Sequence, residues 1–215
     1  MVENMNINLS DLGAKTKEAK NIAQKSRKKA IEIVGDEKLN DKIVQRCVIA
    51  TGDPSISSLL KFKLNPIEEG IKALNKKQPI FTDINMVKAG ITSRSHESKI
   101  KSVIGEGDKL ATEEGLTRTS SGLLTLKDEL NDSIIVIGNA PSALSSLCEM
   151  LEKELINPSL IIGVPVGFVG AKQSKERLYK TDFPSITIEG TRGGTPIAVA
   201  AMNEIINIRK RRKDE

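Results

Sequence analysis

The sequence predicts an α/β fold: a single domain in which helices flank a mainly parallel sheet. Short β-branched runs such as SIIVIGNAP and SLIIGVPVGF are apolar at consecutive positions, which is typical of strands that are buried on both faces. Helical patterns follow glycine-containing loops, as in PSALSSLCEMLEKELIN and TPIAVAAMNEIINIRKRRK. Strand, loop, helix and strand in alternation indicate a parallel sheet.

The composition favours one domain with an aliphatic core. A chain of 215 residues is short enough for one hydrophobic core to serve it. Aromatic residues make up only 2% and Trp is absent, so Ile, Val, Leu and Ala must fill the interior. Two cysteines are too few for a disulfide framework, and we expect both to be reduced. Because neither a signal-peptide pattern nor a long apolar run occurs, we expect a cytoplasmic protein without membrane association.

The chain divides into a helical part, a sheet part and a tail. Residues 11–75 are predicted to be mainly helical, with two amphipathic helices that are separated near Gly35 and Asp36. After a TGDP turn and a short apolar run, Asn65 and Pro66 mark the start of a further helix. Residues 79–208 carry the sheet pattern. The basic tail, residues 209–215, is interpreted as solvated, and we expect no contact with nucleic acid.

Four strand ends are predicted to meet around one crevice. The strands are followed by the polar or glycine-containing segments DIN, GNAPS, GVPVGF and EGTRGG. In an open parallel sheet, ligands bind at the carboxyl ends of the strands, where backbone N–H groups point outward. Each segment alone is equally typical of a tight turn. Together, and with a net charge of +5, they favour a binding site for an anionic ligand.

Further residues near these segments have two interpretations each. Lys172 and Lys175 follow a glycine pair, where their ammonium groups can meet carboxylates or remain solvated. Arg118, in GLTRTSSGL, belongs to a mobile lid or to plain surface. Gly193 and Gly194 allow the backbone to approach a ligand or a neighbouring chain. The alanines that follow them permit close helix packing, in the core or at a dimer seam: Ala198, Ala200 and Ala201.

Common cofactor and metal motifs are missing from the sequence. Neither GxGxxG nor GxxxxGK[ST] occurs, so the sheet is Rossmann-like in layout but lacks a dinucleotide fingerprint and a P-loop. No Cys/His cluster has metal-ligand spacing. His96 is the only histidine and has no catalytic partner at motif spacing, so we interpret it as an exposed loop residue. A generic nucleotide or sugar-phosphate site is therefore disfavoured.

Six segments, in their order and spacing, resemble the precorrin-8X methylmutase family, also called precorrin isomerases: KIVQRCVIATGDP, PIFTDINMVKAGI, TRTSSG, IVIGNAPSAL, IIGVPVGFVGAKQSKE and IEGTRGGTPIAVAAMNEI. The resemblance implies an α/β homodimer with a pocket for a corrin-like polycarboxylate, precorrin-8 or cobalt-precorrin-8. It also implies an isomerase of cobalamin biosynthesis that moves a methyl group between adjacent ring carbons and yields hydrogenobyrinate or cobyrinate. No redox cofactor and no protein-bound metal are implied.

One segment departs from the pattern of this family. The family commonly has R-[VM]-I-H-A-[TC]-G, whose histidine is thought to protonate the macrocycle, and this chain has RCVIATG with Ile49 at the histidine position. An aliphatic side chain cannot transfer a proton. Three outcomes stay open: binding strain and electrostatics suffice, Cys47 or His96 supplies the proton, or the protein binds corrinoids or other tetrapyrroles without isomerising them.

The resemblance also supplies candidate site residues. It places Arg118 at the position of the family's lid arginine and Ser26 at that of a serine near the start of the pocket. The residues expected to contact the ligand are Ser26, Arg46, Thr51, Asp83, Asn85, Met86, Thr119, Ser120, Asn139, Ala140, Pro141, Ser142, Val166, Gly167, Phe168, Lys175, Gly193 and Gly194.

Overall fold

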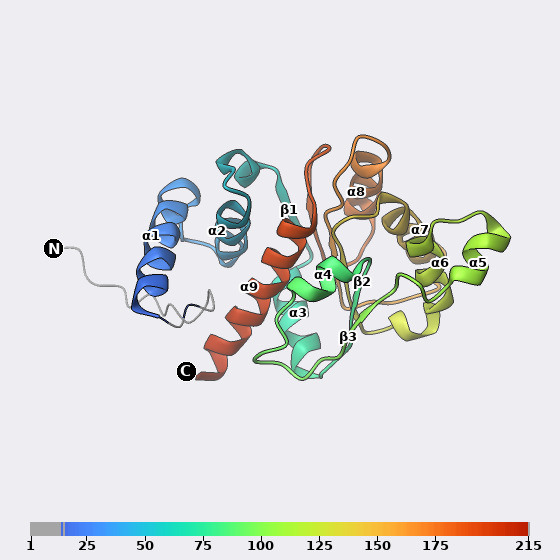
Figure 1. Ribbon diagram of the computed structural model, residues 1–215, viewed down its shortest axis with the longest axis horizontal. Coiled ribbons are helices and arrows are strands. Elements are labelled where there is room, and N and C mark those ends of the chain that lie inside the picture. The colour runs from blue at the N-terminus through green and yellow to red at the C-terminus, as the bar shows by residue number, and fades with distance from the viewer. Residues whose placement is uncertain (1–13, 15, 215) are drawn as a thin grey trace.

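The computed structural model describes residues 14 and 16–214, and within them six strands form one sheet in the order β1-β6-β5-β4-β2-β3 (Figure 1). The strands are β1 (Leu60–Lys63), β2 (Ile80–Thr82), β3 (Ile100–Ser102), β4 (Ile134–Ile137), β5 (Leu160–Gly163) and β6 (Ser185–Ile188). Strands β2 to β6 run parallel, and β1 pairs with β6 in the antiparallel direction. The predicted α/β class with a mainly parallel sheet is confirmed.

Helices cover both faces of this sheet. One face packs against α2 (Leu39–Thr51), α3 (Pro66–Asn75), α4 (Asn85–Gly90) and α9 (Thr195–Asp214). The other packs against α6 (Arg118–Thr125), α7 (Pro141–Glu152) and α8 (Ala171–Lys180). Helices α1 (Lys17–Val34) and α5 (Asp108–Glu114) lie at opposite ends of the long axis in Figure 1, and the 3-10 turns η2 (Pro54–Ser58) and η3 (Lys127–Leu130) complete the connections.

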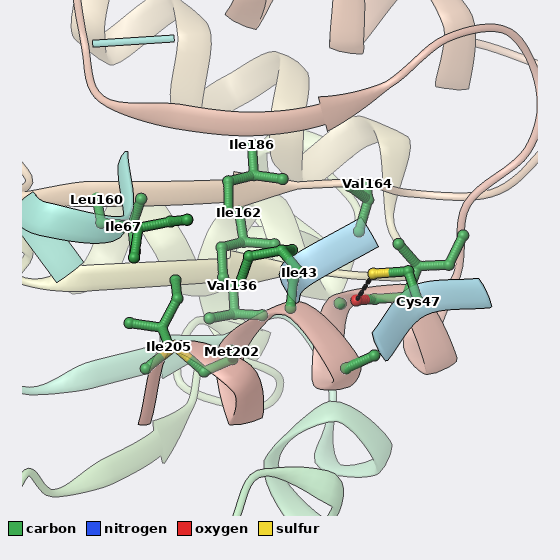
Figure 2. Close-up of a cluster of buried hydrophobic side chains, with 14 of the residues drawn as sticks. Ile43, Cys47, Ile67, Val136, Leu160, Ile162, Val164, Ile186, Met202 and Ile205 are labelled. Atoms are coloured by element: carbon green, nitrogen blue, oxygen red, sulfur yellow. Dashed lines mark hydrogen bonds between the residues drawn. The ribbon is translucent and has the colours of Figure 1, made fainter. Parts of the chain in front are cut away.

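The core is aliphatic, as the composition predicts. Val136, Ile162 and Ile186 form a row across β4, β5 and β6, and Met202 and Ile205 of α9 pack near them (Figure 2). The alternate positions of the same strands face the second cluster under α7 and α8. All residues of β4, β5 and β6 are buried, which explains why these strands read as continuous apolar runs.

The helical start of the chain is confirmed in its described part. Helix α1 ends at Val34 and α2 begins at Leu39, so the break falls at Gly35 and Asp36, as predicted. Helix α3 begins at Pro66, also as predicted, because proline loses no hydrogen bond in the first turn. Residues 11–13 and 15 of the predicted range lie outside the described residues.

Two predictions about the ends of the sheet part need correction. The range 11–75 contains a strand, β1, because its short apolar run pairs with the edge of β6. The predicted solvated tail is helical as far as Asp214, because α9 continues through it. Arg209 is buried and donates hydrogen bonds to Asn75 Oδ1 (2.8 Å) and to the carbonyl oxygen of Ser95 (2.6 Å).

Within the described residues, no helix combines the length and the apolar character that crossing a membrane requires.

Candidate functional site

Three of the predicted loops are joined by backbone hydrogen bonds at the carboxyl edge of the sheet. The N–H of Val164, after β5, donates to the carbonyl oxygen of Ile137 at the end of β4 (2.9 Å). The loop after β6 reaches the loop after β5 twice: Gly194 N–H donates to Val164 O (2.8 Å), and Gly167 N–H donates to Thr191 O (3.1 Å). The structure therefore brings together loops that the sequence predicts to share one crevice.

Gly193 explains how closely two of these loops approach. Its φ of 154° is disfavoured for other residues, and a Cβ atom there would lie 2.3 Å from the carbonyl oxygen of Val164. Gly193 thus packs against the loop after β5, and its approach to a ligand or to a neighbouring chain stays a prediction. Ala198, Ala200 and Ala201 are buried in the core, so they do not form a dimer seam.

Asp83 fixes the loop that follows β4. Its side chain is buried, and Oδ2 accepts hydrogen bonds from the backbone N–H groups of Asn139 (2.6 Å) and Ala140 (2.8 Å). Its Oδ1 atom accepts from the N–H of Ile84 (3.0 Å). Burial raises the pKa of Asp83, although these N–H groups act in the opposite direction. The carboxylate thus faces the GNAPS backbone, and Asn139 is exposed beside it.

The predicted lid arginine lies next to the same loop. Thr117 accepts a hydrogen bond from Ser120 N–H at the start of α6, and its Oγ1 lies 2.8 Å from Ser142 Oγ. The Arg118 guanidinium is exposed and forms a two-bond ion pair with Asp108, at 2.9 and 3.0 Å. This ion pair lowers the pKa of Asp108. Thr119 and Ser120 are buried, whereas Arg118 and Thr117 are exposed, so Arg118 is the charged side chain of this segment that an anion can reach.

Apolar side chains are exposed at this edge. Phe168 is 94% exposed and Val169 is 87% exposed, both in the loop between β5 and α8. Val166 in the same loop and Met86 at the start of α4 are also exposed, and Asn85 lies beside Met86. Exposed apolar side chains that gather at one edge of a protein mark a contact surface for a ligand or a partner.

The end of α2 adjoins the loop after β6. Arg192 Nη1 forms an ion pair with Asp53 Oδ2 (2.9 Å) and a hydrogen bond with Ser55 Oγ. Asp53 follows Thr51, which is exposed and whose Oγ1 donates to the Cys47 carbonyl oxygen (2.9 Å). Ile49 and Arg46 are half-buried on the same helix. The segment that carries Ile49 therefore lies beside the predicted crevice.

Of the two alternative proton donors, Cys47 is buried beneath this edge and His96 lies away from it. Cys47 is fully buried, its Sγ lies 3.8 Å from the Ile197 carbonyl oxygen (Figure 2), and burial raises its pKa to about 12. His96 precedes the amino end of β3, and its Nε2 lies 2.6 Å from the Thr92 carbonyl oxygen. It is half-buried rather than exposed, which corrects the sequence interpretation.

The distance of His96 from the crevice follows from α9. This helix begins at the carboxyl edge with Thr195, and Arg209, fourteen residues later, contacts Ser95 beside His96. At a helical rise of 1.5 Å per residue, the two ends are about 20 Å apart. Ser26 is also apart from the crevice loops, on α1, which packs against α2 at one end of the molecule (Figure 1).

A cavity that the sequence did not predict lies beside the crevice. Its volume is about 650 Å³, and β1, β6 and α8 form its walls. Lys175 is 2% exposed, its Nζ donates to the Arg192 carbonyl oxygen, and burial lowers its pKa to about 8. The cavity was missed because β1 was not recognised as a strand. Its lining residues are Leu59, Lys61, Lys172, Lys175, Glu176, Tyr179, Lys180, Thr187, Ile188, Glu189, Gly190, Thr191 and Arg192.

The part of the chain that the structure describes contains no group of three His, Cys, Asp or Glu side chains that could hold a metal ion.

Comparison with known proteins gives a consistent relationship. Residues 21–208 match the family model of precorrin-8X methylmutase. The chain is 45% identical to the cobalt-precorrin-8 methylmutase of Methanocaldococcus jannaschii, over 94% of this chain and 100% of that one. It is 36% identical to the protein of the same name from Methanothermobacter thermautotrophicus, over 93% and 98%. The precorrin-8x methyl mutase structure from Thermus thermophilus superposes with a TM-score of 0.81 at 27% identity, covering 89% of this chain and 96% of that one. The chain belongs to the precorrin-8X methylmutase family.

Proposed function

We propose that this protein is a methylmutase of cobalamin biosynthesis, an isomerase that moves a methyl group between adjacent ring carbons of precorrin-8 or cobalt-precorrin-8. The observation that carries the proposal is the joining of the GNAPS, GVPVGF and TRGG loops at the carboxyl edge of the sheet. These loops hold the segments that most resemble the family. Relatives that match nearly the whole chain bear the same activity in their names.

The proposed binding mode assigns different tasks to different side chains. The exposed Met86 and Val166 contact the apolar surface of the macrocycle. Arg118 exchanges its ion pair with Asp108 for a carboxylate of the ligand, because an exposed ion pair is weak and readily replaced. Backbone N–H groups at the start of α7 face the crevice, together with the Asn139 and Ser142 side chains, and complete the polar contacts.

Methyl migration in this protein proceeds without an acid at position 49. A 1,5-type shift of a methyl group within the ring system makes and breaks one carbon–carbon bond and needs no external atom. Protonation of the macrocycle accelerates the shift, but the proton is not part of the net reaction. Losing a positioned acid costs on the order of a hundred- to ten-thousandfold in rate. We therefore expect slow turnover.

The test is a direct assay with precorrin-8 and with its cobalt form. The purified protein should convert at least one of them to the rearranged corrin. Absorbance spectra and chromatography would detect this product. A family member that has the histidine serves as the positive control. If that control turns over and this protein gives no product on prolonged incubation, it is not an isomerase.

A second candidate function is corrinoid binding without catalysis, which Ile49 favours. The two functions differ in their expected products and not in their affinity. A pure binding protein should bind cobyrinate stoichiometrically in calorimetry and leave precorrin-8 unchanged. Detection of any rearranged product above the uncatalysed rate would exclude this second function.

We propose in addition that the protein is a cytoplasmic homodimer. The exposed Phe168 and Val169 support a contact surface at the carboxyl edge, since two exposed apolar side chains in one loop are costly to leave in water. Both cysteines are free and buried, as expected in a reducing compartment.

A further inference from the structure

The cavity beside the crevice is strongly basic. Helical spacing puts residues 172, 175, 176, 179 and 180 on one face of α8, which forms one wall. The opposite wall comes from β1 and β6, where Lys61 is the register partner of Thr187. Five basic and two acidic side chains line the cavity. The charged and titratable side chains that face it are Lys61, Lys172, Lys175, Glu176, Tyr179, Lys180, Glu189 and Arg192.

The two acidic side chains are already engaged at the rim. Glu189 forms an ion pair with Lys61 (3.1 Å), and Glu176 forms one with Lys172 (3.8 Å). Arg192 pairs with Asp53, outside the cavity. The cavity thus keeps an excess of positive charge that its own carboxylates do not neutralise.

Lys175 is the most deeply buried of these cations. Among residues 14 and 16–214, no carboxylate lies within ion-pair distance of its ammonium group, and one acceptor, the Arg192 carbonyl oxygen, takes one of its three donors. A buried ammonium with donors left over is costly unless a further acceptor reaches it. The Lys175 side chain lines the cavity, so an acceptor that binds its remaining N–H groups has room there.

One loop separates this cavity from the crevice. Gly190, Thr191 and Arg192 line the cavity, and the next two residues, Gly193 and Gly194, pack against the crevice loop after β5. A ligand that carries carboxylates around its whole rim can therefore occupy the crevice and extend a side chain past this loop.

We propose that the cavity is a carboxylate subsite, which receives peripheral carboxylates of the corrin-type ligand and has Lys175 as its central contact. The inference rests on the proposed function, because it takes the ligand class from it. It adds a second basic group, from α8, to the Arg118 contact on the other side of the crevice. Tyr179 and Ile188 give the cavity an apolar wall for the methylene groups of such a side chain.

The experiment measures cobyrinate binding by calorimetry for the wild-type protein and for Lys175→Met, Lys175→Arg and Lys153→Met. Lys175→Met removes the charge and keeps the length of the side chain. It should weaken binding about ten- to a hundredfold, the value of a charge-assisted hydrogen bond. Lys153→Met is the matched control, because Lys153 is an exposed lysine directly after α7, paired with Glu149, outside the cavity. It should bind like the wild type.

Titrations below and above pH 8 separate a direct contact from a structural role. The affinity of the wild type should fall as the pH rises above about 8, because Lys175 loses its proton there. Lys175→Arg stays charged and should lose this pH dependence. If Lys175→Met fails to fold, the comparison of the wild type with Lys175→Arg still decides the question.

Three results would overturn the inference. If Lys175→Met binds cobyrinate as tightly as the wild type, Lys175 does not contact the ligand. If Lys175→Met binds cobyrinate more weakly but the affinity of the wild type does not depend on pH, Lys175 holds the Arg192 loop and does not contact the ligand. A wild-type protein that binds no cobyrinate and converts no precorrin-8 defeats the proposed function and the subsite with it, whereas normal turnover with an unaffected Lys175→Met defeats the subsite alone.

Discussion

Asp83 connects two strands of the sheet through its side chain. The residue directly follows β2, and its carboxylate accepts hydrogen bonds from two N–H groups of the loop after β4. The contact is buried, and it holds the loop after β4 in place beside Asp83. An aspartate after a strand reads from sequence as a ligand contact. In the structure its Oδ2 accepts hydrogen bonds from backbone groups 56 and 57 residues away, which no local pattern predicts, and a contact with the ligand stays a prediction.

Asp83→Ala should lower the free energy of unfolding by about 2–4 kcal/mol, since the backbone N–H groups of Ile84, Asn139 and Ala140 lose their acceptor. Asp83→Asn is the matched control: its amide oxygen can still accept the bonds from Asn139 and Ala140, so we expect a clearly smaller loss. Urea unfolding followed by circular dichroism measures both. Equal stability of the wild type and Asp83→Ala would show that the loop does not depend on this carboxylate.

Ile49→His should raise turnover of precorrin-8 by on the order of a hundredfold or more, because it supplies a positioned acid on a helix end beside the crevice. Ile49→Leu keeps the side chain aliphatic and should leave the rate unchanged. Single-turnover kinetics measure the chemical step. An unchanged rate for Ile49→His, in a variant that still binds cobyrinate, would mean that proton transfer at position 49 does not limit the shift.

Lys175 makes the stability of the fold depend on pH in the alkaline range. Its pKa is about 8 in the folded protein and about 10.5 when unfolded, so between these values the unfolded chain binds more protons. The free energy of unfolding contributed by this group therefore rises with pH from about 8 to about 10.5. The cost of burying the charged ammonium is fully present below pH 8 and is relieved above it.

We expect the wild type to gain stability relative to Lys175→Met as the pH rises above 8. Denaturant unfolding of both proteins at a series of pH values measures this difference. If the stability of the wild type relative to Lys175→Met stays constant or falls as the pH rises above 8, the burial of a charged ammonium at this position is contradicted.

At the scale of elements, an ion pair holds the first helix against the last. Arg27 of α1 and Glu204 of α9 are both buried and lie 3.1 Å apart, and Gln45 of α2 accepts a further hydrogen bond from Arg27 (3.2 Å). Glu204 also contacts Arg211 (3.2 Å). Because α1 has few apolar residues facing inward, these polar contacts fix its place.

Arg27→Met should destabilise the fold by about 3 kcal/mol, because it leaves the buried Glu204 carboxylate with one partner fewer. The double change Arg27→Met with Glu204→Met should recover much of the loss, since no buried charge remains. Exposed Lys72→Met, which breaks the Glu69 ion pair, is the control and should not change the unfolding midpoint. A double variant that is less stable than Arg27→Met would indicate that the pair itself is favourable.

Elements with a strong local signal were predictable from the sequence. Helix α3 carries Pro66 at its start, and β4 and β5 are continuous apolar runs. Strand β1 could not be predicted, because the apolar and charged residues of LKFK alternate. The segment becomes an edge strand only by pairing with β6, more than 120 residues later. The helical tail was missed because its arginines look solvated, although Arg209 and Arg212 bond to Asn75 and Glu68 of the α3 segment.

At the scale of the molecule, the meeting of the loops at the carboxyl edge was predictable and the cavity was not. The loops follow strand ends that lie in one row of any parallel sheet, so the order of the segments was sufficient. The cavity depends on which helix covers the edge strand and on the burial of Lys175, and both follow from packing between distant segments.

The exposed loop after β5 should determine the oligomeric state. Sedimentation velocity of the wild type should show a dimer, and Phe168→Asp should shift it to a monomer, because a charge placed in an apolar contact loses its hydration. Gln24→Glu, at an exposed position of α1, is a control for added charge. A wild type that sediments as a monomer at all concentrations would contradict the proposed dimer, and its exposed phenylalanine would then be assigned to the ligand.

The joining of α1 to α9 through residues 177 positions apart has a consequence for synthesis on the ribosome. Arg27 is made 177 residues before the Glu204 carboxylate that accepts its hydrogen bonds. Strand β1 is made more than 120 residues before β6, with which it pairs. A nascent chain can therefore pack α1 against α2 early, but neither the α9 contacts nor the edge of the sheet can form until these later segments have been made, so the fold cannot be completed piece by piece along the chain.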